Sequence, residues 1–535
     1  KRPPTRLPRL HPSRPCHPPP HMADASAASD VGAAPQRVVV IGAGASGLAA
    51  ARELRRAGAD VLVVEARGRL GGRICTERFE DGSAVDMGAA WVHGHVPGNP
   101  LTKLAQDCGA TLVETDWENR FVAFPAVGPG SGPPDAAREP LADPDWEDAE
   151  EAFERSWQLH KQAQAKRRKE WPATADEGLW EGVLGLRSQK FPGMQSLPER
   201  TRCIVRHMWA EKTEFDYAAY LEDMSFTWWD ADDMFEGPDC LWPRGYIQLA
   251  EHLAGCEGEA IPSYIRLGCP VASINALDGG GVEVVLGSGE RLPCAAVVCT
   301  LPLGVLRAGR VRFEPPLPEA KVASMQKLAM GLLDKVALRF DRRFWSALPA
   351  CSSAEVCEKS GAEGECHAIV RVATCDARRQ ASAVEAPFWV NLHPATGSNV
   401  LVAYFVAGAA EEAEKMTDED LVQHTMSMVK AMFAEEALAD VHLLEHKVSR
   451  WAADEFSLGS YSYLPTGATP QDRDELARHE GSIFFAGEAT ERRYPQTVHG
   501  AYMSGVRVAK EVTGHLGLTT SGGKRRAGRR SQQKK

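Results

Sequence analysis

The chain has 535 residues, of which 44% are hydrophobic and 25% are charged, and its formal net charge is −11. This length exceeds that of one ordinary domain, so we expect two intertwined domains with ample material for a core. No run of 18 apolar residues occurs, so we expect no transmembrane segment. The 13 cysteines form no Cys-x-x-Cys pair, which indicates reduced thiols and a cytoplasmic location.

The N-terminal end differs in composition from the rest. Residues 1–35 are rich in Pro, Arg and His and lack the apolar core of a secretory signal. We predict a disordered extension there, with Met22 as a candidate start.

The first predicted element is a strand, turn and helix at residues 37–54. Four β-favouring residues run into the pattern Gly-x-Gly-x-x-Gly at Gly42, Gly44 and Gly47, and an apolar pattern at helical spacing follows. Such a turn brings a dinucleotide pyrophosphate against the backbone and the helix N-terminus, where we also expect a contact from Ser46.

A second predicted strand, at residues 61–64, ends on Glu65. This carboxylate stands 18 residues after Gly47, near the spacing expected for the group that binds an adenosine ribose. Together the two strands predict a dinucleotide, but they do not distinguish NAD from FAD.

The residues after Glu65 distinguish the two cofactors. The segment Glu65-Ala-Arg-Gly-Arg-Leu-Gly-Gly-Arg73 places three guanidinium groups and a glycine pair where they can extend along a pyrophosphate. Here the chain resembles the FAD-dependent amine oxidases, the family of monoamine oxidases, polyamine oxidases and flavin histone demethylases. The resemblance implies FAD contacts from Arg67, Gly72, Arg73, Gly88, Ala89, Ala90 and Trp91.

The resemblance covers roughly residues 36–515 and implies an α/β fold, in which a Rossmann-like FAD-binding domain is interleaved with an α+β substrate-binding domain. The FAD-binding domain would comprise residues 36–120, 240–310 and 445–515. The substrate-binding domain would comprise residues 121–239 and 311–444. In the latter, apolar residues at spacings of three and four predict an amphipathic helix at 145–171.

His93 lies in Trp91-Val-His-Gly94, which resembles a motif of polyamine oxidases in which the histidine faces the amine channel. We therefore expect His93 to act on or bind the substrate. Five carboxylates follow further along the chain, at Asp230, Asp232, Asp233, Glu236 and Asp239. They would bind the distal ammonium groups of a polyamine, with Glu236 among them, or form a solvated loop; both readings stay open. Residues 36–523 hold 49 basic and 70 acidic side chains, which fits attraction of polycations or simple solubility.

Strands with turns between them are predicted at residues 264–306, and the resemblance implies that the backbone of Val271 contacts the adenine edge. A further strand carries Lys335. Alternation along it places Lys335 on one face with Ala337 and Arg339, which favours a solvated lysine. The resemblance instead implies a lysine that holds water against flavin N5 and assists reoxidation by O2, and we expect this second role. Trp228, Trp229 and Trp242 are expected in the core.

Four cysteines gather at residues 351–375, beside His367. Their spacing is foreign to zinc sites, so we predict an irregular insertion and no metal site.

The C-terminal part of the predicted site begins with Trp451 and Tyr461, which match positions where the family places rings beside the flavin. Such rings would attract a charged amine and favour its neutral form. Glu488, which ends a predicted strand, would bond a ribityl or neighbouring hydroxyl. Thr497 and Val498 open a helix whose N-terminus would stabilise reduced flavin. Monoamine oxidases of the family link their FAD to a cysteine in this segment; none stands near residue 490 here, so the resemblance implies non-covalent FAD.

The last segment, residues 516–535, is predicted to be a disordered basic tail. Lys524 to Lys535 carries 7 basic and no acidic side chains, which fits a nuclear import signal, a nucleic-acid contact or a solvated end. Elsewhere we expect no nucleic-acid binding. The final residues do not form a peroxisomal tripeptide.

The resemblance thus points to a monomeric polyamine oxidase that acts on spermine, spermidine or an acetylated polyamine and turns O2 into H2O2. A histone lysine demethylase is one alternative. Demethylases of the family carry a helical module before the FAD domain and a long helical insertion, whereas this chain has 36 residues before its first strand and short insertions. A flavin-binding protein without oxidase activity is another alternative. Both free and acetylated polyamines stay open as substrates.

Overall fold

The structure is a computed structural model that describes residues 37–117, 120–123, 144–172, 175–345, 368–371, 386–433 and 437–518. The predicted N-terminal extension, the cysteine-rich insertion and the tail beyond residue 518 lie outside the described residues. Everything described below belongs to the unit that runs from Pro35 to Lys535.

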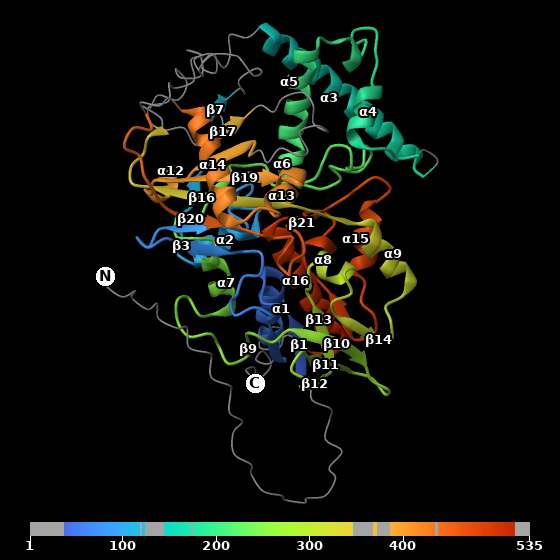
Figure 1. The fold of residues 1–535 in the computed structure, drawn as a ribbon. Coiled ribbons are helices and arrows are strands. Elements are labelled where there is room, and N and C mark those ends of the chain that lie inside the picture. The colour runs from blue at the N-terminus through green and yellow to red at the C-terminus, as the bar shows by residue number, and fades with distance from the viewer. Residues whose placement is uncertain are drawn as a thin grey trace, which may run out of the picture. The chain divides into compact units, whose positions relative to one another are not determined.

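A five-stranded parallel sheet joins the two ends of the chain (Figure 1). The last strand, β22, pairs with β13, and β13 pairs with the first strand, β1. The strands are apolar except at a few end residues because both faces of the sheet are covered. In spatial order they are β22 (Ile483–Phe485), β13 (Ala296–Cys299), β1 (Arg37–Ile41), β2 (Asp60–Val64) and β9 (Ile265–Arg266).

Alternate residues of β1 serve two different cores. Val38 and Val40 pack against three helices, whereas Val39 and Ile41 pack against a second sheet. The helices are α1 (Ala45–Arg56), α7 (Ile247–Ala254) and α16 (Val498–His515). The second sheet contains β12 (Arg291–Cys294), β11 (Val282–Leu286), β10 (Val271–Ala276) and β14 (Arg312–Glu314).

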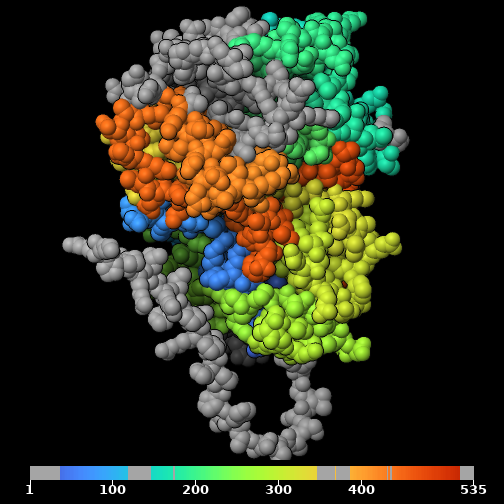
Figure 2. All heavy atoms as spheres, viewed as in Figure 1, coloured from blue at the N-terminus to red at the C-terminus, as the bar shows by residue number. Residues whose placement is uncertain are grey.

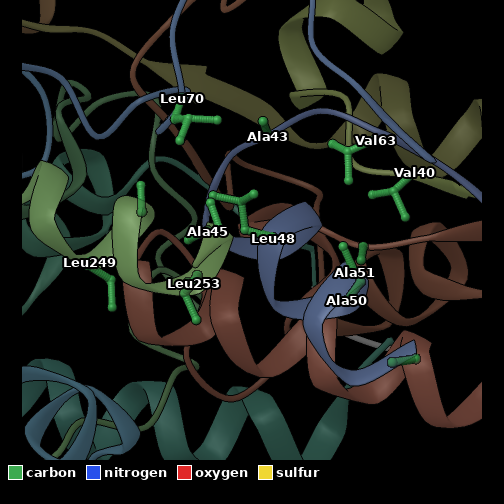
Figure 3. Close-up of a cluster of buried hydrophobic side chains, with 14 of the residues drawn as sticks. Val40, Ala43, Ala45, Leu48, Ala50, Ala51, Val63, Leu70, Leu249 and Leu253 are labelled. Carbon is green, nitrogen blue, oxygen red and sulfur yellow. The ribbon is translucent and has the colours of Figure 1, made fainter. Parts of the chain in front are cut away.

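Small residues let α1 and α16 cross closely in the helical core (Figure 3). An added Cβ at Gly505 of α16 would lie 2.2 Å from the Ser46 carbonyl oxygen and 3.0 Å from the Ala49 Cβ. This close approach fixes the N-terminal end of α16 beside the glycine-rich turn.

A six-stranded sheet forms the other large layer (Figure 1). Its order is β20 (Leu443–Val448), β16 (Leu333–Phe340), β19 (Val400–Val406), β18 (Phe388–Asn391), β17 (Ala368–Arg371) and β7 (Arg120–Ala123). Residues of α13 (Ala407–Ala413) and α14 (Asp418–Met432) cover one face. The hairpin β3 (Thr76–Arg78) and β4 (Ala84–Asp86) contributes Phe79 and Val85 to the core on the other.

A helical layer packs around Trp209, which is fully buried. It contains α3 (Pro144–Glu170), α4 (Leu179–Gly185), α5 (Glu199–Lys212) and α6 (Glu214–Tyr217). The amphipathic helix predicted at 145–171 is confirmed by α3, whose Trp146, Ala149 and Phe153 are buried. Trp229 and Trp242 are also core residues, and Trp228 is partly buried.

Shorter elements connect these layers. One small sheet joins β5 (Trp91–Val92), β8 (Cys240–Leu241) and β6 (Val113–Glu114), and β15 (Ala329–Gly331) pairs with β21 (Tyr461–Tyr463). The remaining helices are α2 (Pro100–Asp107), α8 (Leu303–Arg307), α9 (Glu319–Lys327), α12 (His393–Thr396) and α15 (Pro470–Ala477). The strand prediction for 264–306 is therefore wrong at its end, since a helix begins at Leu303 after Pro302.

The chain is an α/β protein, as the sequence predicts. Among the described residues no helix is both long and apolar enough to cross a membrane. Within the same part of the chain no group of three or more His, Cys, Asp or Glu residues could hold a metal ion.

Candidate functional site

The glycine-rich turn between β1 and α1 leaves no room for a side chain at Gly42 or Gly47. An added Cβ at Gly47 would lie 2.0 Å from the Gly42 carbonyl oxygen, and at Gly42, whose φ is +103°, it would lie 2.5 Å from Thr300 Oγ1. Gly44 precedes α1 without a side-chain cap. Among the described residues the N-cap thus gives no side-chain hydrogen bond to the first N–H groups of α1, and such free N–H groups can bind an anion.

Glu65 lies beside this turn and is 4% exposed. Its carboxylate accepts hydrogen bonds from the backbone N–H groups of Ala43 (2.7 Å) and Arg67 (2.8 Å), one on each oxygen. Each oxygen keeps a lone pair for a ribose hydroxyl. The Ser46 hydroxyl lies 3.0 Å from that of Ser504 on α16, and its predicted cofactor contact stays a prediction.

Arg67 and Arg73 connect the N-terminal part of the chain to the C-terminal part. Arg67 forms an ion pair with Asp454 at 2.7 Å. Arg73 donates to Glu488 Oε1 and to the Ser460 carbonyl oxygen, both at 2.9 Å. In Figure 2 the blue N-terminal segment and the orange-red C-terminal segment lie side by side on one face. The sequence predicts only cofactor contacts for these two arginines. It gives no sign of their contacts with Asp454 and Glu488 in the C-terminal part of the chain.

Other predicted cofactor residues lie around this connection. Gly72 has a φ of +61°, and an added Cβ there would approach the Gly44 Cα at 3.4 Å; at Gly88 it would lie 1.9 Å from the Arg73 carbonyl oxygen. The backbone N–H of Ala89 donates to that same oxygen at 3.0 Å. Ala90 is buried, and Trp91 is partly buried in β5. Val271 is the partly buried first residue of β10.

Glu488 is buried at the start of the short helix η4 (Glu488–Thr490). Besides Arg73, its carboxylate accepts hydrogen bonds from Ser462 Oγ (2.6 Å) and from the backbone N–H of Gln496 (3.1 Å). Burial acts to raise the pKa of Glu488. The nearby Arg73 and Arg473 guanidinium groups outweigh this effect and hold the pKa below its usual value. Glu488 is therefore an ionised, hydrogen-bonded carboxylate at neutral pH.

The N-terminus of α16 lies beside this carboxylate. Thr497 is its N-cap, because its Oγ1 accepts from the Gly500 N–H at 2.9 Å, and Val498 is the first helical residue. The preceding Gln496 has a φ of +66°, a strained value for a residue other than glycine. This backbone conformation directs the N–H of Gln496 towards the Glu488 carboxylate. Nothing in the sequence marked Gln496.

A hollow opens beside Arg73 and Glu488, lined also by Leu301, Pro302 and Gly487. Leu301 and Pro302 belong to the segment that follows β13. The glycine turn, the uncapped helix α1 and Glu65 fit the pyrophosphate and ribose of a dinucleotide.

Lys335 is buried in the middle of β16, with 2% of its surface exposed. Its Nζ donates to the carbonyl oxygens of Asp86 (2.8 Å) and Gly88 (2.6 Å). Desolvation lowers the pKa of Lys335 to about 8, against the opposing attraction of Asp86. The solvated lysine that alternation favoured is wrong, because the β3–β4 hairpin covers this face of the sheet.

Four aromatic side chains from separate elements form what we call the ring cluster, which consists of Trp91, Trp117, Phe388 and Tyr404. Neighbouring ring centroids are 5.2 to 5.8 Å apart. Lys335 Nζ lies 4.7 Å from the Tyr404 ring and 6.0 Å from the Trp91 ring, and Lys335 pairs with Tyr404 across β16 and β19. Sequence analysis found only Trp91, since the other rings come from segments with no recognisable motif.

His93 lies between the ring cluster and a pair of carboxylates, Asp239 and Asp216. His93 Nδ1 lies 3.2 Å from Asp239 Oδ1, and Asp239 also accepts from Trp117 Nε1 at 3.1 Å. Desolvation acts to lower the pKa of His93, but the Asp239 carboxylate raises it above its usual value. Asp216 faces the same two residues, and desolvation raises its pKa to about 6. The imidazole side chain is 56% exposed, so this group is accessible.

The five carboxylates between residues 230 and 239 do not form one site. Asp230 pairs with Lys161 and Arg168, Asp232 accepts from Tyr217 Oη at 2.9 Å, and Asp233 pairs with Arg493 at 2.6 Å. Only Asp239 contacts His93. Glu236 is exposed, and no contact in the described residues connects it to His93.

Trp451 and Tyr461 lie in different surroundings. Trp451 is 6% exposed, packs in the core beneath α13 and α14, and donates from Nε1 to the Met87 carbonyl oxygen at 3.0 Å. It thus supports the backbone segment that Lys335 also binds, and it is not part of the ring cluster. Tyr461 donates from Oη to the carbonyl oxygen of Phe215 at 3.5 Å, and the Phe215 ring lies 6.3 Å from that of Phe388.

Comparison with protein families finds one match, a family described as flavin-containing amine oxidoreductase, over residues 45–513. The chain is 32% identical over 486 residues to lysine-specific histone demethylase 1 homolog 3 of Oryza sativa subsp. japonica, which covers 89% of this chain and 54% of that protein. It is 31% identical over 495 residues to polyamine oxidase 4 of the same plant. That match covers 90% of this chain and 89% of the polyamine oxidase. The chain therefore spans about half the length of the demethylase homologues it matches.

Among solved structures, a putrescine oxidase bound to putrescine has a TM-score of 0.67 and 18% sequence identity to this chain. The match covers 90% of this chain and 99% of that one. At this identity the likeness shows the fold alone.

Proposed function

Because the chain belongs to the family of flavin-containing amine oxidoreductases, we propose that it is a polyamine oxidase with non-covalent FAD. It oxidises a secondary amine of spermine, spermidine or an acetylated polyamine to an imine, which water hydrolyses to an aldehyde and a shorter amine. O2 takes up the two electrons and becomes H2O2. The observation that supports this most is that the buried Lys335, the ring cluster and the His93 carboxylate group adjoin one another.

In this proposal the FAD lies along the glycine turn, with its ribose at Glu65 and its remaining hydroxyls near Arg73 and Glu488. Bound FAD supplies the acceptor for the hydride that leaves the carbon next to the amine nitrogen. Thr497 and Val498 place the N-terminus of α16 where it favours negative charge on the reduced ring.

The ring cluster binds the amine and favours its deprotonated form. Aromatic faces attract a charged amine as it enters, and their apolar surroundings then favour its neutral form. Only the neutral amine has the nitrogen lone pair that assists hydride loss from the adjacent carbon. Trp91 and Tyr404, which flank Lys335, are the rings assigned to this task.

Lys335 holds a water molecule and moves a proton. Its ammonium has three N–H donors, and two of them donate to the backbone carbonyl oxygens of Asp86 and Gly88. The third is left for a water molecule. With a pKa of about 8, Lys335 exchanges protons near neutral pH and so assists the return of electrons to O2.

His93, Asp239 and Asp216 bind a second, distant ammonium group of the substrate. Two carboxylates at one end of the ring cluster suit a molecule with cationic groups at intervals, which a simple monoamine lacks. The direct contact of Asp239 with both His93 and Trp117 supports this assignment. Trp451 supports the Met87 carbonyl, and Tyr461 adjoins the rings.

Anaerobic bleaching of the flavin tests this function. The purified protein is mixed with spermine, spermidine, N1-acetylspermine, a monoamine and a dimethylated histone H3 peptide, and flavin absorbance is followed. We expect a polyamine to bleach the flavin fastest. Bleaching by the peptide alone contradicts the substrate, and a protein that neither contains nor takes up flavin contradicts the whole proposal.

A histone lysine demethylase is the second candidate, and the 32% identity to demethylase homologues favours it. The same experiment separates the two, because a demethylase bleaches with the methylated peptide and not with spermidine.

The proposal extends to organisation and location. The FAD-binding segments are residues 36–120, 240–310 and 445–515, and the substrate-binding segments are 121–239 and 311–444. We propose a cytoplasmic monomer, with the basic tail as a possible nuclear signal. Gel filtration and imaging of the tagged full chain check both statements.

A further inference from the structure

A charged side chain outside the proposed catalytic group lies in the core beside the cofactor region. Arg473 of α15 is 1% exposed. Its Nη1 donates to Ser462 Oγ at 2.7 Å and to the Ala489 carbonyl oxygen at 3.3 Å, while its Nε has no partner among the described residues. Burying a guanidinium group with an unpaired donor is costly, so packing alone gives no reason for an arginine here.

The directions of the hydrogen bonds can be assigned without seeing hydrogen atoms. Arginine only donates, so Ser462 Oγ accepts from Arg473 and its single proton points elsewhere. An ionised carboxylate only accepts, so that proton lies on the 2.6 Å contact to Glu488 Oε2. Arg473 therefore fixes the Ser462 hydroxyl as a donor to Glu488.

The two oxygens of Glu488 are then unequally occupied. Oε2 accepts from the Ser462 hydroxyl, from the Gln496 N–H and, at 3.4 Å, from the Ser462 N–H. Oε1 accepts only from Arg73 within the described residues. Oε1 thus keeps a lone pair for one more donor, and Glu488 and Arg73 both line the hollow.

The charged groups around Glu488 favour its ionised form. Arg73 and Arg473 are the two cations that act on it. Asp232 and Glu491 act on Arg473 from further away. On α16, Arg507 is bound to Phe485 and Thr490, and the pKa of His499 is lowered to about 3 by desolvation, so His499 is neutral.

We propose that Arg473 is a positioning residue for the cofactor: through Ser462 it holds Glu488 as an oriented carboxylate whose Oε1 accepts a hydroxyl of FAD. This inference rests on the proposed function, because it takes FAD as the cofactor. Arg473 itself has no role in the amine chemistry.

The proposal makes FAD affinity insensitive to acid. With two cations nearby, Glu488 stays ionised as the pH falls from 8 to 5. Without Arg473, the Ser462 hydroxyl is free to rotate, and burial raises the proton affinity of Glu488 into this range. A protonated Glu488 offers a weaker acceptor, so the affinity for FAD falls as the pH falls.

The experiment measures the dissociation constant of FAD by flavin fluorescence between pH 5 and 8, for the wild-type protein and the Arg473→Met variant after removal and return of FAD. We expect a flat profile for the wild type. For Arg473→Met we expect affinity roughly tenfold weaker at pH 8 and at least a further tenfold weaker at pH 5. Arg473→Lys keeps a cation and should recover most of the flat profile.

Two more variants keep the test decisive if Arg473→Met does not fold. Ser462→Ala breaks the connection without removing a charge. Its affinity for FAD should also fall as the pH falls, but less steeply than that of Arg473→Met. Arg492→Met is the matched control, since Arg492 lines a second small cavity together with Arg473 and Gln496 but pairs with Asp474 at the surface; its profile should stay flat.

A pH slope that is the same in wild type, Arg473→Met and Ser462→Ala overturns the inference. So does a loss of affinity in these variants that is equal at all pH values, which marks a structural effect. A wild-type protein that binds no FAD overturns the proposed function as well, whereas one that binds FAD with a steep pH slope overturns this inference alone.

Discussion

At the scale of single residues, burial changes the meaning of a polar side chain. Lys335 lies on a strand face that the sequence pattern assigns to solvent, yet it is 2% exposed and its Nζ meets two backbone carbonyls. Asp239 is one of five neighbouring acids, yet it alone contacts His93. Which acid or lysine becomes functional depends on what packs over it.

Replacing Lys335 by Met should slow turnover about 10²-fold, because it removes the water-holding ammonium and a group that exchanges protons. Stopped-flow measurement of flavin reduction and reoxidation checks this, with FAD content determined from absorbance. Lys447→Met is the control, since Lys447 lies on the neighbouring strand β20 and pairs with Glu77. Unchanged flavin kinetics in Lys335→Met would remove Lys335 from the mechanism.

Substrate binding should weaken in acid because of Asp216, whose pKa is about 6. Below that pH the carboxyl group takes up a proton and no longer attracts an ammonium group. His93 gains positive charge over the same fall in pH and adds repulsion. We expect the KM for spermidine to rise roughly tenfold between pH 7 and pH 5.

Asp216→Asn tests the origin of that slope. The variant should have a raised KM at pH 7 and a weaker pH dependence, while kcat changes little. A KM profile identical to that of the wild type would show that Asp216 does not face the substrate.

At the scale of elements, close packing between helices fixes the cofactor turn. Gly505 of α16 lies against Ser46 and Ala49 of α1, and the Ser46 and Ser504 hydroxyls meet across the same contact. The sequence predicted α1 and α16 separately, from a glycine motif and a threonine cap. It could not predict their crossing, which depends on small residues such as Ser46 and Ser504, 458 positions apart.

Gly505→Val should destabilise the protein by about 2 kcal/mol or more and weaken FAD binding, because its Cβ would lie 2.2 Å from the Ser46 carbonyl oxygen. Thermal unfolding with and without FAD measures both effects. Gly514→Ala in the same helix is the matched control, because nothing lies within 4 Å of its added Cβ. That change should be neutral or stabilise slightly, by up to about 1 kcal/mol; equal losses in both variants would rule out the helix contact as the cause.

At the scale of the whole molecule, the sequence predicts the α/β class, the first strand, turn and helix, and the helix α3. Local patterns suffice for these because each is written within about 30 residues. The ring cluster could not be predicted, since Trp117, Phe388 and Tyr404 come from separate segments and meet only through sheet pairing. The same holds for Arg473 and Gln496, whose roles depend on burial and on backbone strain. The proposed roles of the predicted site residues stay predictions.

Hydrogen exchange should show that FAD stabilises both ends of the chain together. On addition of FAD to the apoprotein, we expect slower exchange in residues 37–65 and in residues 483–515, because β1 and β22 flank the same strand, β13. The helical layer at 144–217 serves as the internal reference and should change little. Protection confined to the N-terminal segment would contradict a cofactor site built from both ends.

The position of β22 also has a consequence for synthesis. A ribosome releases Arg37–Ile41 early, but Ile483–Phe485, Glu488 and α16 leave it some 440 residues later. Until then β13 has an open edge and Arg73 has no carboxylate partner. Because such distant contacts form slowly, we expect the proposed FAD site to be completed late in folding, and we expect a chain that stops before β22 to expose the unpaired edge of β13.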